Sequence, residues 1–193
     1  MQEISYIGLD ISTSIIGICF LDSNSDLVLL DNINLKKTKS MFSKSEIVKN
    51  RLIEYKNSLK FTKNIKISIE AAFQSFSAGF SSAKTLSQLN RFNGIVSYLV
   101  YDVFSIEPLY INVNSARKNL QIKIDRKSKN STKEQVFEWA RNNLNSEFNW
   151  PEKILKSGPN KGRVKFDESC YDMSDAFVIC KALIFNEESN NKW

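Results

Sequence analysis

Three apolar stretches rich in β-branched residues follow one another at the start of the chain, before any helical pattern occurs. They cover residues 4–10, 15–21 and 27–35, and only short polar segments separate them. Connections this short join antiparallel neighbours, whereas a parallel pair needs a crossover of a dozen or more residues. We therefore expect an antiparallel three-stranded meander that organises the rest of the fold.

The middle of the chain alternates between helical and strand patterns. Apolar residues at helical spacing predict helices over 43–61 and 83–104, and alternation predicts strands over 65–70 and 107–113. The predicted order is β-β-β-α-β-α-β, followed by further helices. A chain of 193 residues with 42% hydrophobic residues suits one α/β domain, which we place over residues 1–193.

The last third of the chain is more polar. A T-x-x-Q pair, Thr132 and Gln135, predicts a capped helix, and two prolines and two glycines within 146–168 indicate an irregular excursion. Asp172 is expected to open a final helix over 175–185. Up to the first turn of that capped helix, seven cations fall within seventeen residues: Arg117, Lys118, Lys123, Arg126, Lys127, Lys129 and Lys133.

Composition excludes several classes of protein. Histidine is absent, which rules out Ser-His-Asp and Cys-His catalysis and histidine-ligated zinc. Cys19, Cys170 and Cys180 lack CxxC spacing and are expected to be buried, reduced thiols. No signal peptide or membrane-spanning run is recognisable, so we expect a cytoplasmic protein that does not associate with a membrane. The net charge of +6 suits a polyanionic partner, although a solvated basic surface would give the same value.

Four acidic residues define the candidate site: Asp10, Glu70, Asp172 and Asp175. Asp172 and Asp175 share one helix face, although such a pair also suits an ordinary helix start. Glu70 could equally point into solvent from an edge strand. Asp10 ends a strand that should be central, where a charge without a partner or metal is unfavourable. Together the four predict a divalent-metal site and a magnesium-dependent nuclease.

Three motifs contain these acids: Ile7-Gly8-Leu9-Asp10-Ile11-Ser12 through Gly17, Ile69-Glu70-Ala71-Ala72-Phe73, and Asp172-Met173-Ser174-Asp175-Ala176. A long helix over 86–103 and the segments 115–118 and 133–136 lie between them. In this order the motifs resemble those of RuvC-type Holliday-junction resolvases, over residues 4–185. The resemblance implies a ribonuclease H-like α/β fold, in which helices flank a mixed five-stranded sheet with three antiparallel strands first.

The resemblance also implies an activity, namely hydrolysis of DNA phosphodiester bonds at four-way junctions by a homodimer. Asp10, Glu70, Asp172 and Asp175 would hold two Mg²⁺ ions, and Mn²⁺ would be able to substitute. Lys133 completes the implied catalytic set, at a helix start where the dipole does not favour a cation.

Four residues are implied to contact DNA. Lys118 and Lys133 would approach the phosphates, and Phe73 matches an aromatic residue that wedges against bases at the branch point. A core aromatic is the alternative for Phe73. Arg117 would be either a DNA contact or a mere surface charge.

One departure from the family pattern affects the expected substrate. Cellular members usually have Pro-Gly after the first aspartate, whereas Ile11-Ser12-Thr13 follows here, which resembles divergent phage- and virus-encoded relatives. A branched-DNA or flap nuclease of broader specificity would carry the same acids. Two alternatives of other classes are an actin-like ATP-binding domain, which needs a second domain and a glycine-rich motif, and a junction-binding scaffold without catalysis, which should have lost an acid.

Overall fold

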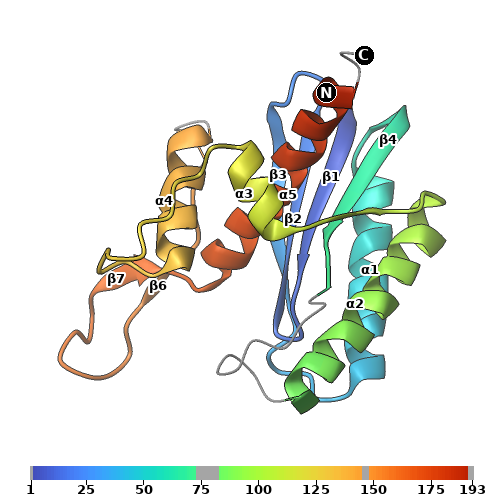
Figure 1. Cartoon of the computed structure of the whole chain (residues 1–193). Coiled ribbons are helices and arrows are strands. Elements are labelled where there is room, and N and C mark those ends of the chain that lie inside the picture. The colour runs from blue at the N-terminus through green and yellow to red at the C-terminus, as the bar shows by residue number, and fades with distance from the viewer. Residues whose placement is uncertain (1, 73–82, 145–147, 191–193) are drawn as a thin grey trace.

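A five-stranded sheet flanked by helices forms the body of the protein in a computed structural model that describes residues 2–72, 83–144 and 148–190 (Figure 1). The strand order is β3-β2-β1-β4-β5, with antiparallel pairing among the first three strands and parallel pairing of β1 with β4 and of β4 with β5. This arrangement confirms the predicted mixed sheet. The strands are β1 (Ile4–Ile11), β2 (Ile15–Asp22), β3 (Leu27–Asn34), β4 (Phe61–Glu70) and β5 (Leu109–Ile111).

Helices cover both faces of the sheet. Two of them, α1 (Met41–Ser58) and α2 (Ala83–Phe104), pack on one face and on each other, and α5 (Ser169–Asn190) packs on the opposite face, chiefly against β1 and β2 (Figure 1). The bounds of α2 are those predicted. No helix in the described part of the chain is long and apolar enough to cross a bilayer.

Several element boundaries differ from prediction, and two of these differences have a clear local cause. Helix α1 ends at Ser58 and β4 already begins at Phe61, because the Phe61 ring packs edge-on against Phe20 and Phe104 in the sheet core. Strand β5 stops at Ile111, because the Asn112 side chain accepts hydrogen bonds from the next backbone amides and caps α3 (Val113–Asn119). That short helix was not predicted.

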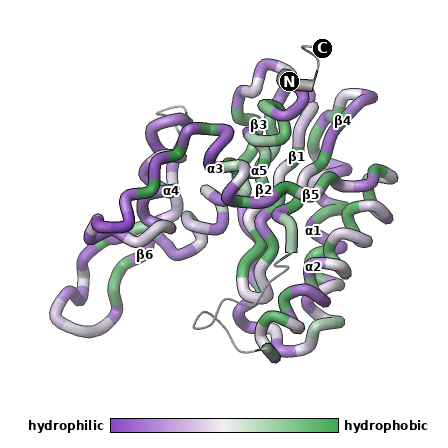
Figure 2. The backbone as a smooth tube through the Cα atoms, in the orientation of Figure 1, coloured by the Kyte–Doolittle hydropathy of each residue, from purple (hydrophilic) through white to green (hydrophobic). Residues whose placement is uncertain are grey.

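The α4 region stands apart from the sheet. It comprises α4 (Thr132–Asn143) and a two-stranded ribbon of β6 (Glu152–Ile154) and β7 (Val164–Phe166) (Figure 1). Only the ribbon lies within the predicted irregular excursion. The predicted Thr132 cap was wrong by one residue: Ser131 is the N-cap, and Glu134 completes the capping box. Figure 2 shows mainly hydrophobic strands in the sheet, whereas the loop that joins β6 to β7 is mostly hydrophilic or intermediate.

The three cysteines are buried free thiols, as predicted. Cys19 of β2 meets Cys180 of α5 inside the interface between sheet and helix, where burial raises the pKa of the Cys19 thiol well above its usual value. The fit there is close, because a Cβ atom added to Gly8 of β1 would lie 2.5 Å from the Cys180 Cβ. Glycine therefore lets α5 approach the sheet.

Candidate functional site

Asp10 and Glu70 lie side by side at the ends of two adjacent parallel strands. Leu9 of β1 pairs with Ile69 of β4, so the next residue on each strand is one of the two acids. Their carboxyl groups are close enough to share a hydrogen bond, which requires a proton on one of the two. The Asn93 amide of α2 donates to the Glu70 carbonyl at 3.1 Å and holds this end of β4 in place.

A glycine on β2 brings the other two acids to the same place. Asp10 is opposite Gly17 in the β1–β2 pair, and a Cβ atom on Gly17 would lie 2.0 Å from the carbonyl oxygen of Asp172. The backbone of α5 therefore lies directly against the sheet beside Asp10, and Asp175 follows one turn later. We had not predicted this role for Gly17, although a glycine inside a strand indicates a close backbone approach.

These acids share one electrostatic environment. Asp10, Asp172 and Asp175 are 7%, 9% and 7% exposed. Burial raises the pKa of Asp10 well above its usual value, and the hydrogen bond and charge of Glu70 raise it further. Burial raises the pKa of Asp172 to about 6 against the opposing charge of Lys133, and it raises the pKa of Asp175 against that of Arg117. The structure thus gathers negative charge in a poorly solvated place.

The helix-cap explanation of Asp172 and Asp175 is wrong. Helix α5 begins at Ser169, six residues before the predicted start at 175, and Asp167 is the residue whose side chain accepts a hydrogen bond from the Ser169 amide. Asp172 is therefore inside the first turns of the helix and buried, as is Asp175.

The donor chemistry of the four carboxylates fits a divalent cation. Magnesium and manganese favour oxygen ligands, and a cation would offset both the burial and the neighbouring acidic charges that raise the pKa of Asp10. In the described residues, however, no three acids are arranged as a ready-made metal site. The Asp10 and Glu70 carboxyl groups share a hydrogen bond through a proton, and Asp175 accepts one from Arg117 at 3.1 Å. The side chains would therefore have to reorient around an ion.

The predicted cations lie on two neighbouring elements. Lys133 is exposed on the first turn of α4, close enough to act on the charges of Asp172 and Asp175. Arg117 is mostly buried, and its Nε has no hydrogen-bond acceptor among the described residues. Exposed Lys118 lines an open hollow of about 440 Å³ that it shares with Arg117 and Arg126.

One cation beside the site was not predicted. Lys36, which follows β3, partly opposes the burial that raises the pKa of Asp172, and it forms an ion pair with Glu168 at 3.0 Å. No sequence pattern pointed to Lys36, because its approach depends on how α5 packs on the sheet. Phe73, the predicted wedge, lies outside the described residues, as does the 75–82 segment.

Comparisons with known proteins bear on the fold. No protein-family model matches the chain, and no curated protein sequence is detectably similar to it. Among solved structures, Thermus thermophilus RuvC in complex with a Holliday junction substrate is similar, with a TM-score of 0.61 at 11% identity over 95% of this chain and 94% of that chain. A second Thermus thermophilus RuvC structure gives 0.57 at 11% identity, over 95% of each chain. The chain therefore has the ribonuclease H-like α/β fold of RuvC.

Proposed function

We propose that this protein is a metal-dependent endonuclease that cleaves branched DNA and resolves four-way junctions. The observation that carries the proposal is the meeting of Asp10, Glu70, Asp172 and Asp175 at one end of a RuvC-like sheet. Buried like charges are unfavourable for folding, so their assembly calls for a ligand that compensates them. The junction bound in the similar RuvC structure supports branched DNA as substrate.

The four carboxylates would bind two Mg²⁺ or Mn²⁺ ions, which activate water and stabilise the leaving oxygen during phosphodiester hydrolysis. Asp10 and Glu70 would hold this centre from the sheet, and Asp172 and Asp175 from α5. The two pairs stay in register because α5 lies against Gly17. With no histidine in the chain, protons would pass to carboxylate, lysine or solvent.

The surrounding cations would hold the substrate. Lys133 is exposed beside Asp172 and would bind a phosphate there, and Lys118 would bind another from the hollow. Arg117 donates to Asp175 at 3.1 Å and would orient that carboxylate. An ion-paired arginine this close to the acids would also limit their mutual repulsion before the substrate arrives.

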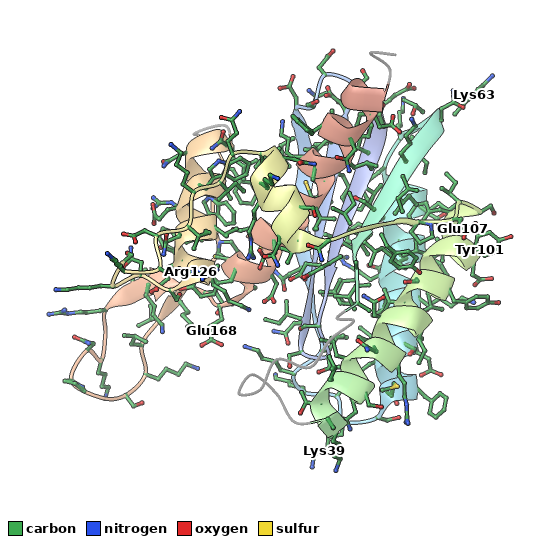
Figure 3. The ribbon with its side chains drawn as sticks, in the orientation of Figure 1. Lys39, Lys63, Tyr101, Glu107, Arg126 and Glu168 are labelled. Atoms are coloured by element: carbon green, nitrogen blue, oxygen red, sulfur yellow. The ribbon has the colours of Figure 1, made fainter. Side chains whose placement is uncertain are left out.

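Symmetrical resolution of a four-way junction requires two active sites, so we propose a homodimer with two-fold symmetry. Exposed aromatic residues on α2, Tyr98 at 63% and Tyr101 at 52%, offer an apolar surface for it. Tyr101 is labelled in Figure 3, on the side of α2 that faces solvent. A molar mass of twice the chain in sedimentation equilibrium would support this state. The proposed location is the cytoplasm of a bacterium or of a host cell.

The decisive experiment compares cleavage of a labelled four-way junction, a flap, a nicked duplex and an RNA–DNA hybrid in Mg²⁺. We expect the junction, or the branched substrates as a class, to be cut fastest. Preference for the hybrid would contradict the proposal. Metal binding is tested separately by calorimetric titration of Mn²⁺ into the wild type and into Asp10→Asn. Equal heats for the two proteins would contradict the assignment of the metal site.

A further inference from the structure

The β6–β7 ribbon, residues 152–166, is an exposed and strongly basic element. Every residue from 156 to 165 is exposed, and the ribbon extends away from the body of the protein (Figure 1). Its only acidic residue is Glu152, against five cations: Lys153, Lys156, Lys161, Arg163 and Lys165. The motifs that define the candidate site do not include this segment.

The base of the ribbon is fixed to the helices of the candidate site. The Phe166 ring packs edge-on against Phe137 of α4 with centroids 5.0 Å apart, and the Arg141 guanidinium lies over the same ring at 4.8 Å. The Tyr171 ring also packs edge-on against Phe137, with centroids 5.9 Å apart, and the next residue is Asp172. The ribbon is therefore held at a defined position relative to a catalytic acid.

The cations at the base and toward the tip differ in their partners. Lys153 forms an ion pair with Glu168 at 2.9 Å and lies 3.7 Å from Asp167, so its charge is used inside the protein. The other four cations form no ion pair with any residue that the structure describes. These four are Lys156, Lys161, Arg163 and Lys165.

Charge and shape together select the partner. A second copy of this chain carries the same net charge of +6 and the same basic ribbon, so like charges oppose self-association through this element. A two-stranded ribbon fits the major groove of duplex DNA, where cations on its edges meet phosphates. Ile154 and Val164, cross-strand partners that are 63% and 57% exposed, add an apolar surface for sugars and base edges.

We propose that the β6–β7 ribbon binds one duplex arm of the DNA substrate outside the active site. The proposal rests on the proposed nuclease function, which supplies the DNA. About seven residues on each side of the ribbon span at most roughly 25 Å. This reach corresponds to about seven base pairs at ~3.4 Å each. The fixed base of the ribbon would then set the distance between that arm and Asp172.

The test measures binding to a four-way junction in EDTA, so that cleavage does not enter. Lys161→Gln combined with Arg163→Gln should lower the slope of log affinity against log salt by about two units, because two phosphate contacts are lost. The matched control is Lys60→Gln with Lys63→Gln, which removes the same charge at the start of β4, the end opposite Glu70. Lys63 is labelled in Figure 3. We expect its slope to match that of the wild type.

Arm length provides a second test. With arms of about twenty base pairs the ribbon variant should bind more weakly than the wild type, whereas with arms of about six base pairs the difference should shrink, because the ribbon then reaches past the DNA. A second pair, Lys156→Gln with Lys165→Gln, should behave like the first. Because all four side chains are exposed, we expect the substitutions to leave the fold intact. Unchanged melting temperatures of the variants will verify this.

Equal salt slopes for the ribbon variants and the control would overturn the proposal, and so would a loss that does not depend on arm length. A change in oligomeric mass with DNA binding intact would overturn it as well, and would show that the ribbon contacts protein. Failure of the nuclease proposal is detected in a different experiment, the cleavage assay, where the wild type would show no Mg²⁺-dependent activity. The two failures are therefore distinguishable.

Discussion

The sheet with α5 and the α4 region with its ribbon use charge in opposite ways. At the sheet, the acids are buried in a tightly packed interface. A single Cβ atom added to Gly17 would displace α5 there. On the ribbon, cations extend into solvent from a base held by a few aromatic contacts, such as that of Phe137 with Phe166. Groups that perform chemistry need fixed positions, whereas groups that follow a polyanion only need to reach it.

The largest expected effect comes from the acids themselves. Asp10→Asn or Glu70→Gln should reduce cleavage by about three orders of magnitude or more, because a ligand of the proposed metal centre is lost. Junction binding should survive, since the basic surface is unchanged. Single-turnover cleavage and a gel-shift titration measure the two properties. Cleavage within a few-fold of the wild type would remove the residue from the site.

The close packing of α5 predicts the next largest effect. Gly17→Ala should lower the free energy of unfolding by about 3 kcal/mol, because the new methyl group meets backbone atoms of Asp172 that cannot turn away. Gly94→Ala is the control: its Cβ would meet nothing within 4 Å, and alanine in a helix should stabilise by about 0.5–1 kcal/mol. Urea unfolding measures both. Similar stability of the two variants would show that α5 is not seated as described.

Ionisation of the buried acids predicts a dependence on pH that magnesium should remove. The pKa of Asp172 is about 6 when folded, against 3.8 for an ordinary aspartate, so its contribution to stability is present below about pH 4 and is lost as pH rises through 6. In EDTA the melting temperature of the wild type should therefore fall relative to Asp172→Asn over this window. Added Mg²⁺ should reverse the fall. Parallel profiles without metal would contradict the raised pKa.

The smallest expected effect belongs to the exposed lysines nearest the acids. Lys118→Gln and Lys133→Gln should each lower the slope of log affinity against log salt by about one unit and weaken binding on every DNA sequence tested. Lys133→Gln should also slow cleavage, because Lys133 lies beside Asp172, whereas Lys118→Gln should act mainly on binding. A fluorescence anisotropy series in salt measures the slopes. Slopes that remain unchanged would leave both lysines as solvated surface.

Much of the body of the fold could be predicted from the sequence because its signals are local. The first three strands and α2 are long, strongly patterned segments, and the predicted α2 bounds match those observed. Short elements were missed because a single side chain decides them. Asn112 converts the end of a predicted strand into α3, and Ser131 forms the cap that was predicted for Thr132.

The sequence singles out the individual acids of the candidate site, but it does not specify how the fold brings them together. Sequence periodicity places Asp10 and Glu70 at strand ends, but their adjacency follows from the parallel pairing of β1 with β4, which is a non-local contact. The partnership of Arg117 with Asp175 likewise depends on α3 packing against α5. Such contacts join residues far apart in the chain, and no local pattern specifies them.

The contact between Cys19 and Cys180 allows separation of α5 from the sheet to be measured by thiol labelling. Both thiols are buried between β2 and α5, and the raised pKa of Cys19 keeps it in the unreactive thiol form. A thiol reagent can reach them only when α5 leaves the sheet, and that same movement carries away Asp172 and Asp175. The rate of labelling at Cys19 therefore reports the opening of the candidate site in the native protein, and no engineered cysteine is needed.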